Sequence, residues 1–348
     1  MGTADVGREA AEETARIVRK AVEAAVWAPS VHNTQPWTFG VRGSRVSVRA
    51  DDDRRLGAAD PRGREMLISC GAALCTLRIA IRALGREAET DVLPDPDRPH
   101  LLADVRLGTR TPGDEQDLRL YAAVHRRRAH RGAFRGAGAP PSLLPALKRE
   151  VEQEGAQLIQ AVETHTQEAL AGLTRVAEHV QRLDPAHAGE AARWAPVPGS
   201  GRRDGVHESA YPAGSPRTEP DFPGRDFARG HGWGAQDIAD EVQEVHETGG
   251  TRPGTGVILL ITTPGDTPRD WIRAGQALQR MLLRAASDEG LAAAFHTQAL
   301  EIPELRDFIR ARFCNGRYPQ MLLRLGVPLG PELDSVRRPA DAVISEEF

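Results

Sequence analysis

Two long stretches of the chain carry apolar residues at the three- and four-residue spacing of a single helix face. The first predicts a helix over 66–84 that ends at Gly85, and the second predicts a helix over 271–286 that ends at Gly290. Their apolar positions are Leu67, Cys70, Leu74, Leu77, Ile81 and Leu84 in the first, and Trp271, Gly275, Leu278, Leu282 and Ala285 in the second. Long helices with such a face are usually buried, so we expect both in the core.

Shorter predicted elements surround these two helices. The same spacing predicts a helix from Arg8 to Trp27, and Gly43-Ser44 between two short apolar runs predicts a β-hairpin. Further helices are predicted over 142–154, 168–183 and 237–246, and further strands over 88–92, 101–107, 156–162, 257–263, 291–297 and 320–325. The chain therefore mixes helices and strands along its whole length.

The two long helices are followed by similar sequences. Gly71-Ala72-Ala73-Leu74 matches Gly275-Gln276-Ala277-Leu278, and the terminating glycines lie 14 and 15 residues further on. In both cases a strand, a proline-containing connection and a second strand ending in Arg-Leu-Gly follow, at 106–108 and 324–326. These matches predict a duplicated unit of fold size, and chance similarity between two amphipathic helices is the alternative.

One segment, at about 194–235, has neither helical nor strand periodicity. It is crowded with Gly, Pro, Arg and Asp, and it is longer than ordinary connections inside a compact protein. Its aromatic residues are Trp194, Tyr211, Phe222, Phe227 and Trp233. Because disordered segments are poor in aromatic residues, this composition favours a lid over an active site, with a disordered surface loop as the alternative.

Composition limits the class of protein. Of 348 residues, 40% are hydrophobic and 27% charged; the net charge is −4 and the pI about 6.3, which gives no general attraction to nucleic acid. No stretch approaches the roughly 20 apolar residues that span a membrane, and the polar N-terminus has no signal-peptide core, so we expect a cytoplasmic protein. Cys70, Cys75 and Cys314 show no metal spacing and predict no disulfide.

The loop over 28–39 is the most distinctive stretch. Its two prolines, with Ser30 and Asn33, prevent the preceding helix from continuing, and Trp37 and Phe39 provide apolar anchors. Its hydrogen-bonding side chains are Ser30, His32, Asn33, Thr34 and Gln35. Short polar loops between rigid elements often hold binding residues, although a capped helix end with a surface loop would have the same composition.

The order Pro29-Ser30-x-x-Asn33-x-Gln35-Pro36-Trp37 resembles the flavin-ring loop of the nitroreductase family. The resemblance implies an α+β fold and FMN bound at a dimer interface. One subunit would contribute this loop and the other an arginine-rich phosphate motif.

The two halves of the chain carry complementary parts of such a site. The predicted first half, 1–120, contains the loop, and the second, 121–348, contains the arginine run 126–131, while its own loop is reduced to Glu154-Gly155. The chain therefore looks like a nitroreductase homodimer fused into one polypeptide, similar to the Acg-like subfamily of actinobacterial proteins. This resemblance implies one composite site, for which a monomer would suffice; it leaves higher oligomers open.

The resemblance also implies the residues that bind FMN. The family's Arg-x-Ser/Thr-x-Arg phosphate motif corresponds to Arg127 and Arg131, with Ala129 in place of the usual hydroxyl. The remaining implied contacts are Arg337 and Arg338 with the phosphate, Pro29, Ser30, His32, Asn33 and Gln35 with the ring and ribityl chain, and the backbone near Gln298 with the flavin N5. The alternatives are a solvated basic run and, for His32, a histidine bonded to its own backbone.

The resemblance implies an oxidoreductase that passes hydride from NAD(P)H through FMN to a small nitroaromatic or quinone-type acceptor. The flavin supplies that chemistry, so no catalytic side chain is assigned. A second hypothesis is an FMN-sequestering protein with a covered flavin and little turnover; a third is a nucleic-acid or scaffold protein that uses the basic run. No metal site is assigned, because His125 and His130 lack helical spacing and a third ligand.

Overall fold

The computed structural model describes residues 3–136, 140, 142–211, 216–227, 252–288, 290–330 and 335–346. Its helices are α1 (Thr3–Ala25), α2 (Arg64–Ala83), α3 (Glu115–Ala122), α4 (Leu143–Gln153), α5 (Thr164–Leu183), α6 (Pro185–Arg193), α7 (Pro268–Asp288), α8 (Gln298–Glu301) and α9 (Pro303–Phe313). Its strands are β1 (Trp37–Arg42), β2 (Arg45–Ala50), β3 (Arg86–Val92), β4 (Leu101–Arg110), β5 (Phe134–Arg135), β6 (Gln157–Gln160), β7 (Pro253–Gly254), β8 (Val257–Thr263), β9 (Ala292–Phe295), β10 (Tyr318–Gly326) and β11 (Ile344–Glu346). The predicted helix over 237–246 and parts of the 194–235 segment lie outside the described residues.

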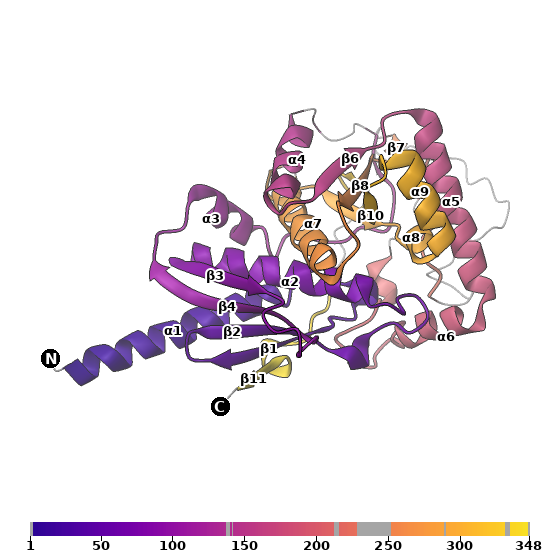
Figure 1. Cartoon of the computed structure of the whole chain (residues 1–348). Helices are drawn as coiled ribbons and strands as arrows, with labels where there is room; N and C mark the ends of the chain where they lie inside the picture. Colours follow the sequence, from indigo (N-terminus) through magenta and orange to yellow (C-terminus); the bar gives the residue numbers. More distant parts are fainter. Residues whose placement is uncertain are drawn as a thin grey trace.

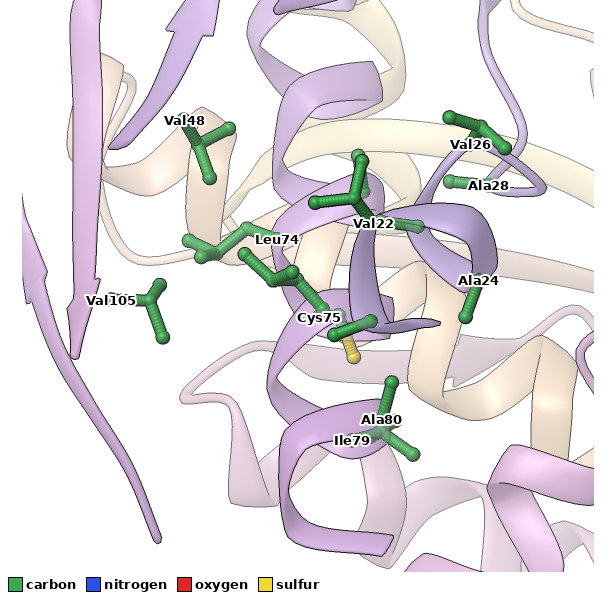
Figure 2. Close-up of a cluster of buried hydrophobic side chains, with 14 of the residues drawn as sticks. Val22, Ala24, Val26, Ala28, Val48, Leu74, Cys75, Ile79, Ala80 and Val105 are labelled. Atoms are coloured by element: carbon green, nitrogen blue, oxygen red, sulfur yellow. The ribbon is translucent and has the colours of Figure 1, made fainter. Parts of the chain in front are cut away.

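The first sheet has the order β11-β1-β2-β4-β3 and is covered on one face by α1 and α2. The predicted hairpin is confirmed: β1 and β2 are antiparallel, and Gly43 takes the positive φ, +57°, that the tight turn requires. Figure 2 shows Val48 and Val105 of this sheet facing Leu74 of α2. The period-2 pattern of the strands and the apolar stripe of α2 thus meet in one core.

The second sheet has the order β6-β8-β10-β9 and has helices on both faces. Successive residues of β10 alternate between the two sides: Leu323 packs in the cluster of α4 and α7, and Leu322 in the cluster of α5, α8 and α9. Because both faces are covered, β8 and β10 are almost continuously apolar.

Helices α2 and α7 cross where the two sheets meet (Figure 1), and two glycines make this approach possible. A Cβ atom on Gly71 would lie 2.2 Å from the Ile272 carbonyl oxygen, and one on Gly275 would lie 1.9 Å from the Ile68 carbonyl oxygen. Ile272 lies three residues before Gly275, and Ile68 lies three residues before Gly71, so the two contacts are reciprocal. Contrary to the sequence-based expectation, one described helix, α2, is long and apolar enough to span a membrane by length and composition alone, and its burial in the core explains this apolar character.

The tail returns to the first sheet after leaving the second. Strand β11 pairs in parallel with β1, with Phe39 opposite Ile344. The sequence pattern predicted neither this strand nor helices α3, α6, α8 and α9. The return matters for the site, because it brings Arg337 and Arg338 beside the 28–39 loop.

Candidate functional site

A cavity lies between the two sheets, and its walls come from distant parts of the chain. The 28–39 loop and the first turns of α2 line one side, residues 294–298 and Arg324 line another, and Arg131 lines a third. The described part of the irregular segment contributes Val206, Tyr211, Phe222, Gly224, Arg225 and Phe227. A concave, largely apolar pocket with a few converging polar groups is the usual form of a cofactor site.

The loop that enters this cavity is held in an uncommon backbone conformation. His32, Asn33 and Gln35 all have positive φ, at 47°, 52° and 50°. The Ser30 hydroxyl accepts a hydrogen bond from the Gln35 amide at 2.9 Å, and the Val31 amide donates to Ser69 Oγ at 3.1 Å. Left-handed conformations of residues other than glycine persist only where the surroundings determine them, and they often mark binding sites.

His32 is fully buried, lines the cavity, and has no hydrogen-bond partner for either ring nitrogen among the described residues. Burial, with Arg225 and Arg131 nearby, holds its pKa well below the ordinary histidine value. The imidazole is therefore neutral at pH 7, with one donor and one acceptor free. It does not bond its own backbone, and its orphaned nitrogens are groups that a ligand's polar edge would satisfy.

Asn33 and Gln35 do not line the cavity. Asn33 donates to the Gly205 carbonyl at 2.9 Å and accepts from Arg337 at 3.0 Å. Gln35 donates to the Arg203 carbonyl at 2.9 Å and accepts from the Arg338 amide at 2.8 Å. Their amides thus tie the irregular segment and the tail to the loop, whereas Pro29, Ser30 and His32 face the cavity.

The arginine run and the tail bring together two buried cations that have no ion-pair partner within the described part of the chain. Arg127 and Arg337 are 2% and 7% exposed, both Nε groups lack an acceptor, and neither forms an ion pair with a described residue. Burial and the neighbouring cation Arg128 lower the pKa of Arg127 to about 10; burial and Arg127, Arg128 and Arg131 hold that of Arg337 well below its ordinary value. Buried cations of this kind require an anion, and forked guanidiniums match a phosphate.

The other two predicted phosphate arginines are placed differently. Arg131 lines the cavity, donates to the Ala210 carbonyl at 3.4 Å, and lies 5.4 Å from the Tyr211 ring centre. Arg338 lies 3.9 Å from Asp51, so its charge is partly balanced. The run is therefore not uniformly solvated: Arg127 is buried and Arg131 lines the cavity, while the third arginine of this group, the buried Arg337, comes from the tail.

At the opposite wall, strand β9 leads into the short helix α8. Gln298 begins α8, lines the cavity, and donates through its side chain to Glu178 at 3.2 Å. His296, just before it, accepts a 2.8 Å hydrogen bond from Arg324. The predicted backbone contact near Gln298 thus lies on the cavity wall, facing the 28–39 loop residues.

Three carboxylates behind this wall were not found by sequence reasoning. Glu301 accepts from Arg225 at 2.5 Å, and Glu178 accepts from the Asp226 amide at 2.8 Å. Burial and the nearby Glu301 raise the pKa of Glu65, which lines the cavity, to about 8. Arg225 therefore anchors the irregular segment in an acidic cluster. The three carboxylates lie on separate elements, α2, α5 and α8, so no contiguous sequence pattern pointed to the cluster.

The described residues suggest no other cofactor chemistry. No group of three or more His, Cys, Asp or Glu side chains within them could hold a metal ion. All three cysteines are buried and free, and burial raises the pKa of Cys75 and of Cys314 to about 12. A thiol with so high a pKa is a poor nucleophile.

Comparison with known proteins gives three relatives in Mycobacterium tuberculosis H37Rv. A putative NAD(P)H nitroreductase is 35% identical over 317 residues, covering 90% of this chain and 85% of that protein. An uncharacterised protein is 30% identical over 339 residues, covering 94% and 92%. The putative NAD(P)H nitroreductase acg is 28% identical over 340 residues, covering 95% and 96%. No family model matches the chain.

Proposed function

This chain belongs to the nitroreductase family, and we propose that it binds one FMN in the cavity between its two sheets. The proposed activity is hydride transfer from NAD(P)H through the flavin to a nitroaromatic or quinone-type acceptor, in the cytoplasm. Two relatives are named as putative NAD(P)H nitroreductases, and the chain matches them along most of its length. Bound FMN would supply the redox chemistry itself.

The observation that carries the proposal is the pair of buried cations, Arg127 and Arg337, that form no ion pair with any described residue. Arg127 and Arg337, with Arg131 at the cavity wall, would hold the phosphate, which repays the cost of burying their charges. His32 would meet the polar edge of the flavin ring with its free ring nitrogens. The roles left to the protein are binding, orientation and exclusion of water, so no side chain is assigned acid–base work.

We further propose that the chain corresponds to a fused homodimer. The reciprocal contacts of Gly71 with Ile272 and of Gly275 with Ile68 are those expected across a two-fold axis, where residue i meets j and j meets i. The predicted halves, 1–120 and 121–348, would then be the two former subunits, with the tail strand exchanged between them.

The second candidate function is FMN sequestration. The irregular segment lines the cavity through Tyr211, Phe222 and Phe227, and Arg225 fixes it in the acidic cluster. Such a cover would act as a lid that keeps NAD(P)H from the flavin. An enzyme would need this lid to open during turnover.

A test of both candidates begins with the purified protein. We expect a flavin spectrum with one FMN per chain, measured as absorbance against protein mass, and bleaching of the flavin by NAD(P)H without oxygen. One FMN that NAD(P)H does not bleach would support sequestration. Two FMN per chain would contradict the single composite site, and failure to load any flavin would overturn both candidates.

A further inference from the structure

Three arginines line the cavity, and their charges are balanced in different ways. Arg225 donates to Glu301 at 2.5 Å and lies close to Glu178 and Glu65. Arg131 belongs to the arginines that are proposed to bind the FMN phosphate. Arg324 belongs to neither arrangement, although it is only 5% exposed.

The guanidinium of Arg324 contacts only neutral groups among the described residues. Its Nε donates to His296 Nε2 at 2.8 Å, and one terminal nitrogen donates to the Thr255 carbonyl at 3.3 Å. It forms no ion pair there, and the acidic group that acts on it, Asp221, also interacts electrostatically with Arg175 and Arg217. Three of its five N–H groups therefore lack a hydrogen-bond acceptor within the described part of the chain, which is costly for a buried cation.

The hydrogen bond between Arg324 and His296 identifies the tautomer of the histidine. Because a guanidinium has no acceptor atom, Nε2 of His296 must be the acceptor and Nδ1 carries the ring proton. Burial and the charge of Arg324 hold the pKa of His296 well below its ordinary value, so it stays neutral. His296 therefore positions Arg324 without cancelling its charge.

Two aromatic rings lie close to this guanidinium. Arg324 is 5.4 Å from the ring centre of Phe134 and 5.7 Å from that of Phe222, and Phe222 itself lines the cavity. The rings keep water away from the cation and offer a flat apolar face beside it. A planar ligand with an anionic group at one end has the matching shape and charge.

We propose that Arg324, positioned by His296, is an anion-binding subsite for a carboxylate on a planar aromatic acceptor. The inference rests on the proposed function, because it names the class of acceptor that the flavin would reduce. A guanidinium fork presents two parallel N–H groups to two coplanar oxygens, which is the geometry of a carboxylate. The ring of the acceptor would lie along Phe222.

The test compares two acceptors of nearly equal shape, 4-nitrobenzoate and 4-nitrobenzamide. Binding to the FMN-loaded protein is measured by calorimetry under oxygen, without NAD(P)H, so that the readout does not depend on turnover. We expect Arg324→Met to weaken 4-nitrobenzoate binding about 10- to 100-fold, the loss of a charge-assisted hydrogen bond. Binding of 4-nitrobenzamide should change less than threefold, and Arg324→Lys should retain part of the affinity for the carboxylate.

Arg310→Met is the matched control, since Arg310 also stacks on a ring, 3.7 Å from the centre of Tyr318, but does not line the cavity. It should leave both affinities unchanged.

Equal binding of 4-nitrobenzoate by wild type and Arg324→Met, with FMN content intact, would overturn the subsite. Loss of FMN from the Arg324 variants would also overturn it and assign Arg324 to the flavin. Failure of wild type to load FMN would instead remove the proposed function, a result visible before any acceptor is added. If Arg324→Met melts far below wild type, Arg324→Lys decides the question.

Discussion

Helices α2 and α7 share a sequence match at 71–74 and 275–278, but the polar surroundings of their N-terminal ends are opposite. Before α7, Asp266 accepts two hydrogen bonds from Arg306, at 2.8 and 2.7 Å, and one from the Trp271 indole at 2.7 Å. Although burial raises the pKa of Asp266, these donors hold it well below the ordinary aspartate value. At α2, Ser69 holds the 28–39 loop and Glu65 faces the cavity.

The connections that lead into β1 and into β6 differ in the same way. In the second half, Glu154 pairs with Arg78 at 2.8 Å, and a Cβ atom on Gly155 would lie 3.1 Å from Arg273 Nε. In the first half, the equivalent stretch is a loop in which neither ring nitrogen of His32 has a hydrogen-bond partner among the described residues. Polar groups that the protein leaves without hydrogen bonds therefore mark the site, whereas the corresponding positions of the other half form ion pairs.

The largest expected effect concerns the contact that joins the two regions. Gly275→Ala should destabilise the protein by about 3 kcal/mol or more, because its Cβ would meet backbone rather than a movable side chain. Gly71→Ala should cost a similar amount, as a two-fold relation requires. Chemical denaturation measures both.

Gly172→Ala is the matched control, because Gly172 lies inside α5 and a Cβ there meets nothing within 4 Å. It should stabilise the protein by about 0.5–1 kcal/mol through helix propensity. A mild cost for Gly275→Ala, or very unequal costs for the two central glycines, would break the proposed symmetry.

The next effect concerns the N-terminal end of α7, where a substitution should lower stability without affecting FMN binding. Arg306→Met should cost about 3 kcal/mol, since it leaves Asp266 as a largely buried carboxylate without its main partner. FMN affinity of the folded protein should stay within a factor of three, because Arg306 does not line the cavity. Thermal denaturation and flavin titration measure the two quantities, and a large loss of flavin affinity with little loss of stability would contradict the assignment.

The arginines proposed to bind the phosphate should show the opposite effects: weaker FMN binding with little loss of stability. Arg337→Met should weaken FMN binding by about 1.5–3 kcal/mol, which is roughly 10- to 150-fold. Without FMN the variant should be about as stable as wild type, because the hydrogen bond to Asn33 is lost but a buried cation with no ion pair among the described residues is also removed. Arg131→Ala should weaken FMN binding over the same range with little change in apoprotein stability. Unchanged affinity in both variants would reduce the arginine run to a structural feature.

The smallest effect is a pH dependence at Glu65. Its folded pKa of about 8 lies above the unfolded value of 4.5, so between these values the folded state binds more protons than the unfolded state. Stability from this group therefore falls as pH rises, by about 1–2 kcal/mol between pH 6 and pH 8. Glu65→Gln, which keeps a neutral side chain, should flatten this decline in urea denaturation series. An equal slope in the variant would show that Glu65 is ionised in the folded protein at neutral pH.

Local sequence determined much of what forms these regions. The spacing of apolar residues predicted α1, α2 and α7, and Gly43 and Gly85 marked a turn and a helix end where the backbone needs positive φ. The 28–39 loop and the arginine run were also recognisable, because each is a contiguous stretch with an unusual order of residues. Such signals survive in the sequence since the interactions behind them join near neighbours.

Tertiary structure alone decided which charges are paired. Arg225 and Arg324 look alike in the sequence, yet Arg225 pairs with Glu301, 76 residues away, whereas Arg324 donates to His296 and a carbonyl and forms no ion pair among the described residues. The return of β11 to β1 and the pairing of Arg337 with Asn33, 304 residues apart, likewise depend on the closed fold. Ion pairing and burial are properties of positions in space, so a periodic pattern along the chain carries no record of them.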